Sequence, residues 1–254
     1  MGQLDILLAE SNALKQRLDN QRSWRHKAVQ EAFNIEYTYD SNRIEGNTLT
    51  LRETDLVIHK GLTVGGKPLA EHLEAVNHYE AVSYIRELAS DKTLFNRSVL
   101  LSLHALILRG IDKEHAGIYR TIPVMISGSQ HTPHQPWQLD KLMEDYFVFY
   151  KQARDAYHPI ILAAELHERL VTIHPFIDGN GRTARLVMNL ILLQHGFPIA
   201  IIQGDTDSRL AYYAALEKCN LENDKIDFHC LIANTVLTSQ KRLLVLIDEQ
   251  GDRV

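Results

Sequence analysis

The sequence predicts a single all-α domain with a small β-hairpin flap. Along most of the 254 residues, apolar side chains recur every three or four positions, which is the spacing of helices that bury one face. Residues 117–128 depart from that spacing, because they are rich in β-branched and aromatic residues, and a stretch with glycine, serine, proline and histidine follows them. No repeat, low-complexity tract or long linker divides the chain.

The apolar spacing predicts a series of helices. The first is amphipathic, with leucines at positions 4, 7, 8, 14 and 18, and packs on the core or on a second copy of the chain; packing on the core is the simpler arrangement. The second covers residues 37–45 and ends at Gly46-Asn47, since both residue types tolerate the left-handed conformation that terminates helices. Others are expected over residues 51–60, 69–88, 96–108, 138–153, 159–173, 181–195, 207–220 and 226–247.

Composition and charge exclude some classes of protein. A net charge of −5 gives no case for general nucleic-acid binding, which depends on lysine and arginine contacts to phosphate. No apolar run approaches the roughly 20 residues that span a bilayer, and the N-terminus lacks the pattern of a signal peptide. Cys219 and Cys230 are expected to be reduced thiols. We therefore expect a cytoplasmic protein.

The residues that carry chemistry lie between two predicted helices. Pro175 ends the first helix, since the residue before a proline avoids the helical conformation. Residues 178–181, Asp-Gly-Asn-Gly, then enter the second helix. The glycines let backbone N–H groups converge, and the helix start adds unpaired N–H donors. The loop therefore predicts an anion site that suits a phosphate group.

Charged side chains complete this site. Arg182 and Arg185 are three residues apart, so both project from the first helical turn toward the same anion, and guanidinium binds phosphate oxygens in a fork. Asp178 lies at the mouth of the loop, where a carboxylate beside a polyphosphate typically holds Mg²⁺. His174 is the group here that accepts a proton near neutral pH. The set predicts attack of a hydroxyl group on a nucleotide phosphate.

Residues 174–185 resemble the Fic signature, H-P-F-x-D/E-G-N-G-R-x-x-R, and match it at every defined position. The resemblance implies the Fic fold, a helical core with a β-hairpin flap over the active site. It also implies Mg²⁺-dependent transfer of AMP from ATP to a serine, threonine or tyrosine of a target protein. Gly181 is typical of the AMP-transferring members, because the kinase-like members carry lysine there.

The same resemblance implies roles for individual residues. His174 is the expected catalytic base, Phe176 the buried anchor of the loop and Asp178 the Mg²⁺ ligand. Arg182 is expected at the β-phosphate and Arg185 at the γ-phosphate. The expected ATP-binding residues are Gly179, Asn180, Gly181, Arg182, Arg185, Tyr212, Tyr213 and Asn220, of which the last three match positions that contact adenosine in relatives.

A second motif precedes the first. Residues 41–46, Ser-Asn-Arg-Ile-Glu-Gly, resemble the inhibitory motif of the family, [S/T]-x-x-x-E-[G/N]. This resemblance implies that Glu45, in a motif with Ser41 and Gly46, pairs with Arg185 and takes the place of the ATP γ-phosphate. We expect residues 1–50 to form N-terminal helices that include the inhibitory helix, and residues 51–254 to form the Fic catalytic core, within one compact domain.

The leading hypothesis is a protein adenylyltransferase that Glu45 inhibits in cis. In the flap, the side chains Val124, Met125 and Ile126 are expected to bind the target by strand addition, with a plain surface hairpin as the alternative. Two other functions stay open: a hydrolase that removes AMP with the help of Glu45, and a nucleotide-binding regulator without catalysis. The expected partners are ATP and an unknown target protein; self-modification and a homodimer are left open.

Overall fold

The protein is built from helices. The structure is a computed structural model that describes residues 2–21 and 27–251, and every regular element within them is a helix, as the all-α prediction requires. The elements are, in chain order, α1 (Gln3–Asn20), α2 (Lys27–Ile44), α3 (Leu51–Lys60), α4 (Leu69–Ser90), α5 (Arg97–Leu108), the 3₁₀ helix η2 (Pro136–Gln138), α6 (Leu139–Ala153), α7 (Pro159–Ile173), α8 (Asn180–Gln194), α9 (Thr206–Glu222) and α10 (Ile226–Gly251).

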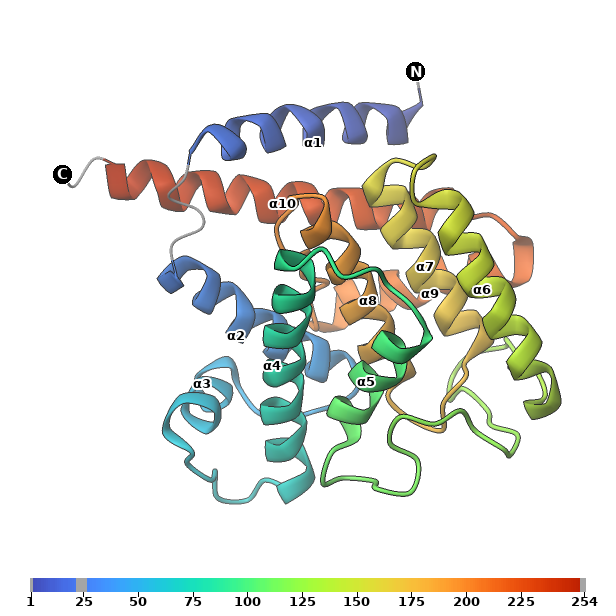
Figure 1. Ribbon diagram of the computed structural model, residues 1–254. Helices are drawn as coiled ribbons and strands as arrows, with labels where there is room; N and C mark the ends of the chain where they lie inside the picture. Colours follow the sequence, from blue (N-terminus) through green and yellow to red (C-terminus); the bar gives the residue numbers. More distant parts are fainter. Residues whose placement is uncertain (1, 22–26, 252–254) are drawn as a thin grey trace.

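Helix α8 runs through the middle of the molecule (Figure 1). It packs against α4, α5 and α7, and every residue from position 182 to 192 is buried. A helix that is buried on all sides belongs to the core rather than to the surface. The loop that enters α8 is therefore attached to the most rigid part of the fold, which fixes the position of its side chains.

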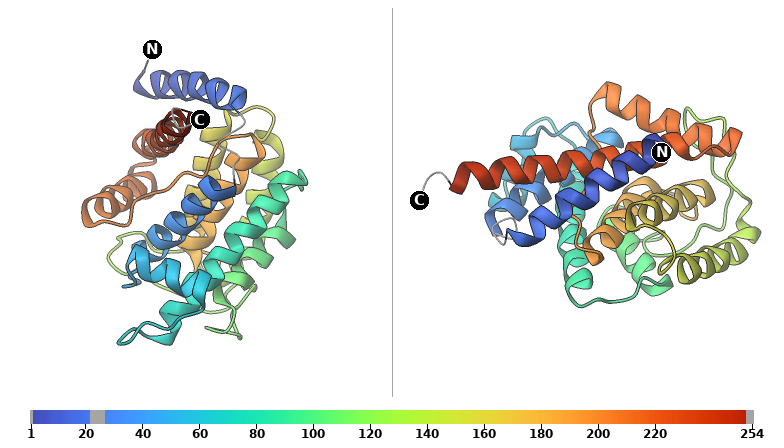
Figure 2. Two further views of the ribbon diagram at one scale, coloured as in Figure 1. Left: turned by 90° about the vertical axis from the view of Figure 1, so that its left-hand side faces the viewer. Right: turned by 90° about the horizontal axis from the view of Figure 1, so that it is seen from above.

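Helix α1 lies along α10, as Figures 1 and 2 show. Ser11 donates a hydrogen bond from its hydroxyl to Gln240 Oε1 (2.8 Å), and Gln240 Nε2 donates to the Ser11 carbonyl (3.0 Å). Both side chains are fully buried, so this pair fixes α1 on α10. The N-terminal helix thus packs on its own core, which was the simpler of the two predicted arrangements.

Helix α10 corrects one expectation from the sequence. Its stretch Ile226–Ile247 is long and apolar enough to cross a membrane by length and composition alone, whereas no such run was expected. More than half of the stretch is buried inside the molecule, against α1, α7 and α9. This burial is typical of the core helix of a globular protein, and it accounts for the apolar composition.

Helix α2 is longer than predicted. The expected helix began at residue 37, but the observed one begins at Lys27. Val29, Phe33 and Tyr37 are buried at a spacing of four residues and continue the apolar stripe toward the N-terminus of the helix. The helix ends as predicted, because Gly46 has a φ angle of +100° and the Asn47 N–H donates back to the Asn42 carbonyl (3.1 Å).

The predicted β-hairpin is replaced by an irregular loop. Residues 117–135 contain no strand, although their composition favours one. Pro123 and Pro133 supply a physical reason, because each lacks the N–H group that a strand ladder needs. Instead of a ladder, side chains from this loop and from neighbouring helices hold it. The prediction of an all-helical fold is confirmed, and its hairpin is corrected to this flap loop, residues 117–135.

Gly204 is required by a close approach of two segments. A Cβ atom at this position would lie 2.8 Å from the Arg43 Cβ and 2.9 Å from the Asp40 carbonyl oxygen, both on α2. Because these atoms are not the ends of flexible side chains, we expect Gly204→Ala to lower the free energy of unfolding by about 1–3 kcal/mol, as overpacking does. Urea unfolding measures this loss.

The matched control is Gly65→Ala. Nothing lies within 4 Å of a Cβ built on Gly65, and its φ angle is outside the left-handed region. This control should leave the urea midpoint unchanged or raise it slightly. Equal midpoints for the two variants would contradict the close contact at Gly204.

Candidate active site

A stacked pair of aromatic rings supports the loop between α7 and α8. His174 ends α7 in a left-handed conformation, with φ 53° and ψ 59°, and Pro175 follows it. Phe176 is fully buried and stacks on His104, with 3.6 Å between ring centroids and 8° between planes. Phe176 therefore lies where an anchor of the loop should lie.

Two polar side chains set the backbone of this loop. His104 Nε2 donates to the Asp178 carbonyl (2.9 Å), while its Nδ1 accepts from the Gly117 N–H (2.9 Å). Asn180 closes the loop on Phe176, since its Oδ1 accepts from the Phe176 N–H (3.0 Å) and its Nδ2 donates to the Phe176 carbonyl (2.9 Å). The Asn180 side chain is thus used within the loop, which leaves its backbone N–H for an anion.

The start of α8 is open to an anion. Gly179 occupies the N-cap position with a φ angle of +76°, and it has no side chain to cap the first N–H groups of the helix. At Gly181, an added Cβ would lie only 2.3 Å from Glu45 Oε1 and 3.1 Å from Arg185 Nη1. The missing side chain at position 181 therefore provides the space into which the Glu45 carboxylate fits.

Arg185 is completely buried and faces this space. Its Nη2 donates to Glu45 Oε1 (2.7 Å) and to the Ser41 carbonyl (2.8 Å), and its Nε donates to Ser41 Oγ (3.0 Å). Among the described residues its Nη1 has no partner. A buried charged donor without an acceptor is costly. Since Nη1 lies beside Gly181, Arg185 is arranged to receive a further anion at the start of α8.

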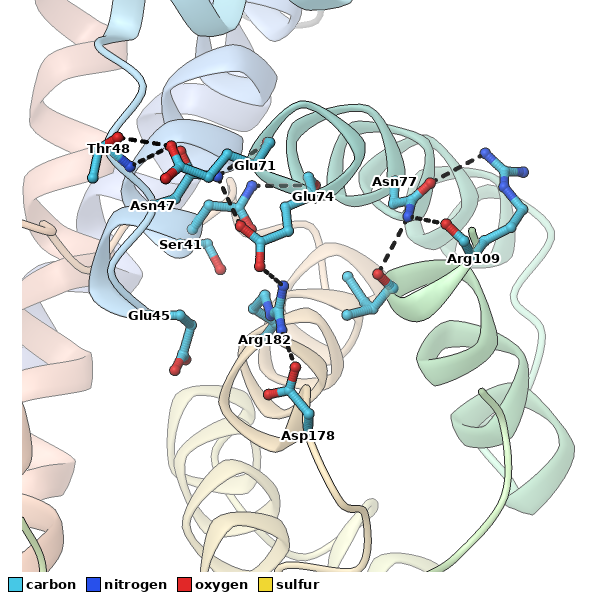
Figure 3. Close-up of polar contacts among 12 residues, drawn as sticks. Ser41, Glu45, Asn47, Thr48, Glu71, Glu74, Asn77, Arg109, Asp178 and Arg182 are labelled. Carbon is cyan, nitrogen blue, oxygen red and sulfur yellow. Dashed lines mark hydrogen bonds and ion pairs between the residues drawn. The ribbon is translucent and has the colours of Figure 1, made fainter. Parts of the chain in front are cut away.

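Arg182 is shared between two carboxylates (Figure 3). Its side chain is 3% exposed, and it donates from Nη1 to Glu74 Oε1 and from Nη2 to Asp178 Oδ2, each at 3.0 Å. Asp178 is 63% exposed, so its carboxylate is open to solvent on one side. Glu74, on α4, has no counterpart in the sequence motif, and no signal in the sequence singled it out.

His174 is prepared to accept a proton. Its Nδ1 lies 3.2 Å from the Val171 carbonyl, which can only accept a hydrogen bond. Nδ1 therefore carries the ring proton, and Nε2 has the free lone pair. Burial lowers the pKa of His174 below its ordinary value, a shift that the carbonyl opposes and nearby Arg120 reinforces. The imidazole is neutral at pH 7 for this reason.

Arg120 connects the flap loop with the loop between α7 and α8. Its N–H donates to the Pro175 carbonyl (2.9 Å) and its Nε to the His174 carbonyl (2.8 Å). Its two terminal nitrogens donate to the carbonyls of Ile122 and His134, one on each leg of the flap loop. One buried guanidinium group thus fixes both legs of the flap loop against His174.

The far end of the flap loop is held from α9. Glu217 accepts from the Ser129 hydroxyl (2.6 Å) and from the Gln130 N–H (2.7 Å). Between these attachments, Met125 is 89% exposed, while its neighbours Val124 and Ile126 are half-buried. The predicted target-binding residues therefore lie in an anchored loop that presents Met125 to solvent.

Residues 94–192 match the model of the Fic/DOC family. The chain is 38% identical over 202 residues to the protein adenylyltransferase Fic of Nematostella vectensis, a match that covers 76% of this chain and 45% of the relative. It is 37% identical over 210 residues to the protein of the same name from Drosophila grimshawi, a match that covers 82% of this chain and 42% of the relative. The chain belongs to the Fic/DOC family.

Solved structures of Fic proteins have the same fold. Fic-1 (residues 134–508) from C. elegans is 27% identical and superposes with a TM-score of 0.85, over 97% of this chain and 73% of that one. A Fic domain containing signaling protein from Bacteroides thetaiotaomicron, 26% identical, gives 0.80 over 98% of this chain and 97% of that one. The chain spans less than half the length of the curated Fic relatives described above.

The three residues expected at adenosine have different environments in this Fic fold. Tyr212 is buried, and its hydroxyl group is bonded to His167 Nε2 (3.0 Å), so its side chain packs in the core. Tyr213 is partly exposed and donates to the Ile44 carbonyl (3.1 Å). Asn220 contacts Thr172 Oγ1 and lines a cavity of about 330 Å³. The structure therefore leaves Tyr213 and Asn220 as the accessible members of this set.

The contacts of Arg120 predict a specific loss in one variant. We expect Arg120→Lys to speed amide hydrogen exchange over residues 121–135 by about tenfold or more, because an ammonium group cannot reach three carbonyls as a guanidinium fork does. Hydrogen–deuterium exchange with peptide-level mass spectrometry measures this.

Arg97→Lys is the control for this experiment. Arg97 lies over the Tyr119 ring and is mostly exposed, and its ion-pair partner is the exposed Asp140, at 3.5 Å. Its substitution should leave exchange in the flap loop unchanged. Unaltered exchange in the Arg120 variant would show that the flap loop does not depend on this guanidinium group.

Proposed function

We propose that this chain is a protein adenylyltransferase that transfers AMP from ATP to a hydroxyl group of another protein. One observation carries the proposal: a neutral histidine precedes a helix start that holds two buried arginines, each of which binds carboxylate oxygens. The similarity to curated proteins named protein adenylyltransferase Fic supports it. Because the match covers under half of those relatives, the target and any partners of the whole protein are not carried over.

The proposed reaction follows from the positions of the residues. His174 Nε2 takes the proton from the target hydroxyl, and the oxygen attacks the α-phosphorus of ATP. The bond from that phosphorus to the bridging oxygen breaks, and pyrophosphate leaves. The N–H groups at the start of α8 face the α-phosphate, where negative charge increases during attack, while Arg182 and Arg185 hold the leaving pyrophosphate.

The residues present fit one Mg²⁺ ion. Among the described residues no three histidine, cysteine, aspartate or glutamate side chains form a cluster that could hold a metal. Mg²⁺ commonly needs only one or two carboxylates, since phosphate oxygens and water complete its shell. Asp178 would be that ligand, because its carboxylate is exposed at the mouth of the loop. The ion would offset the charge of the triphosphate.

We propose further that Glu45 inhibits the enzyme in cis. Its carboxylate occupies the side of Arg185 that faces Gly181, where a γ-phosphate would need to bind. Glu45 is 33% exposed and lies one residue after the end of α2, so it can be displaced without unfolding the core. A second activity, removal of AMP, is favoured by the same position, since a carboxylate near His174 can orient a water molecule.

Labelled ATP distinguishes transfer of AMP from transfer of phosphate. With ATP labelled on the α-phosphate, Glu45→Gly should raise protein labelling by about tenfold or more, because Arg185 becomes free for the γ-phosphate. Adding His174→Ala should lower it by about 10²–10⁴-fold, the usual contribution of a general base. The measurement is autoradiography of target lysate and of the chain itself.

The control uses ATP labelled on the γ-phosphate. Label from the γ position would move the assignment to phosphate transfer, and no label from either position with an active lysate would contradict AMP transfer. Release of AMP from a modified target by the wild-type chain, lost in Glu45→Gly, would support the second activity.

The proposed role of His174 predicts how activity depends on pH. Since burial lowers the pKa of His174, its neutral form persists below the ordinary value of about 6.5. The kcat/KM of Glu45→Gly should therefore stay level from about pH 8 to about pH 6.5 and fall only at lower pH, as the base becomes protonated. Circular dichroism at each pH checks that the fold is intact. A midpoint above about pH 7 would contradict a neutral, buried base.

A further inference from the structure

Two carboxylates contact Arg182, and Glu74 is the less exposed of the two. Its side chain is 21% exposed, against 63% for Asp178, so the Glu74 pair is the less screened of the two. The two carboxylates bind different nitrogens of the same guanidinium group, Glu74 on the side of α4 and Asp178 on the side of the loop mouth (Figure 3). Together they fix its orientation.

The second oxygen of Glu74 is also occupied. Its Oε2 accepts from Asn47 Nδ2 (2.8 Å), and Asn47 lies two residues after Glu45. Asn47 cannot reverse its amide group without loss, because its Oδ1 accepts from the Leu49 N–H (3.0 Å) and its Nδ2 also donates to the Glu71 carbonyl (3.1 Å). One carboxylate therefore connects Arg182 with the loop that follows the inhibitory helix.

We propose that Glu74 is a positioning residue for nucleotide binding: it holds Arg182 toward the β-phosphate and ties this arginine to the end of the inhibitory helix. The proposal rests on the proposed function for the identity of the nucleotide. Without Glu74, the guanidinium group is free to turn toward Asp178, which then competes with the phosphate for both of its terminal nitrogens.

Glu74→Gln tests this with the smallest change of shape. Glutamine has one acceptor oxygen, so it can serve either Arg182 or Asn47 but not both. The matched control is Glu71→Gln, one turn earlier on α4. Glu71 accepts from the N–H and hydroxyl groups of Thr48, so the control removes the same charge and loosens the same loop but leaves Arg182 untouched.

The readout is the affinity for ADP compared with AMP, measured by calorimetry on the full chain with Mg²⁺. Neither nucleotide has a γ-phosphate, so neither needs to displace Glu45. We expect Glu74→Gln to weaken ADP binding about tenfold and to leave AMP binding unchanged, because only ADP has the phosphate that Arg182 holds. Loss of a negative charge alone would strengthen ADP binding, which is the opposite sign.

Hydrogen exchange tests the link to the inhibitory helix without any nucleotide. We expect Arg182→Lys to speed exchange of amides 45–49 several-fold, although among the described side chains it is Glu74 that connects Arg182 to this loop. In a Glu74→Gln background the same substitution should add nothing. Melting temperatures and circular dichroism of each variant check that the fold is kept.

The outcomes separate this inference from the proposed function. An unchanged ratio of ADP to AMP affinity, an equal change in the Glu71 control, or additive exchange effects would overturn the role of Glu74. Normal nucleotide binding without any AMP transfer would overturn the proposed activity alone. A wild-type chain that binds neither ADP nor AMP would overturn both.

Discussion

Two arginines buried at the start of one helix are the constraint on which the site depends. A guanidinium group stays charged at any ordinary pH, so removing it from water requires anionic partners nearby. The fold supplies these partners from its own chain: Glu45 from the end of α2, Glu74 from α4 and Asp178 from the loop. The same positive charge that suits a triphosphate therefore attracts carboxylates when no nucleotide is bound.

This competition explains why the elements around α8 are so closely connected. Arg185 donates two hydrogen bonds to Ser41 in the last turn of α2 and one to Glu45 just after it. Tyr213 on α9 donates to the final carbonyl of that helix. Arg120 holds the flap loop and the loop between α7 and α8 together, because it donates to backbone carbonyls of both. Backbone carbonyls thus hold Arg120 and part of Arg185, whereas two carboxylates hold Arg182.

The sequence predicted residues that lie within two short motifs, residues 41–46 and 174–185, and missed Glu74, which lies in neither. His174, Asp178, Arg182 and Arg185 could be named because their spacing around a helix start has a chemical meaning. Glu74 could not, because a glutamate on a distant helix looks like any solvated residue until the chain is folded. The β-branched composition favoured a hairpin. Pro123 and Pro133, one on each leg of the flap loop, lack the N–H groups that a strand ladder needs, and side-chain hydrogen bonds hold the loop instead. The apolar spacing of Val29, Phe33 and Tyr37 extends α2 toward the N-terminus beyond its predicted start.

The position of Glu45 at a helix terminus has a kinetic consequence. The last carbonyl groups of α2 all have partners, because those of Ser41 and Ile44 accept from Arg185 and Tyr213, and the two between them accept from backbone N–H groups of residues 45–47. Gly46, with its left-handed backbone, allows the chain to leave the helix at that point. The partly exposed Glu45 carboxylate can therefore leave Arg185 by rotation of its own side chain, a motion far faster than rearrangement of domains, whereas unwinding of the last turn would also break contacts to α8 and α9.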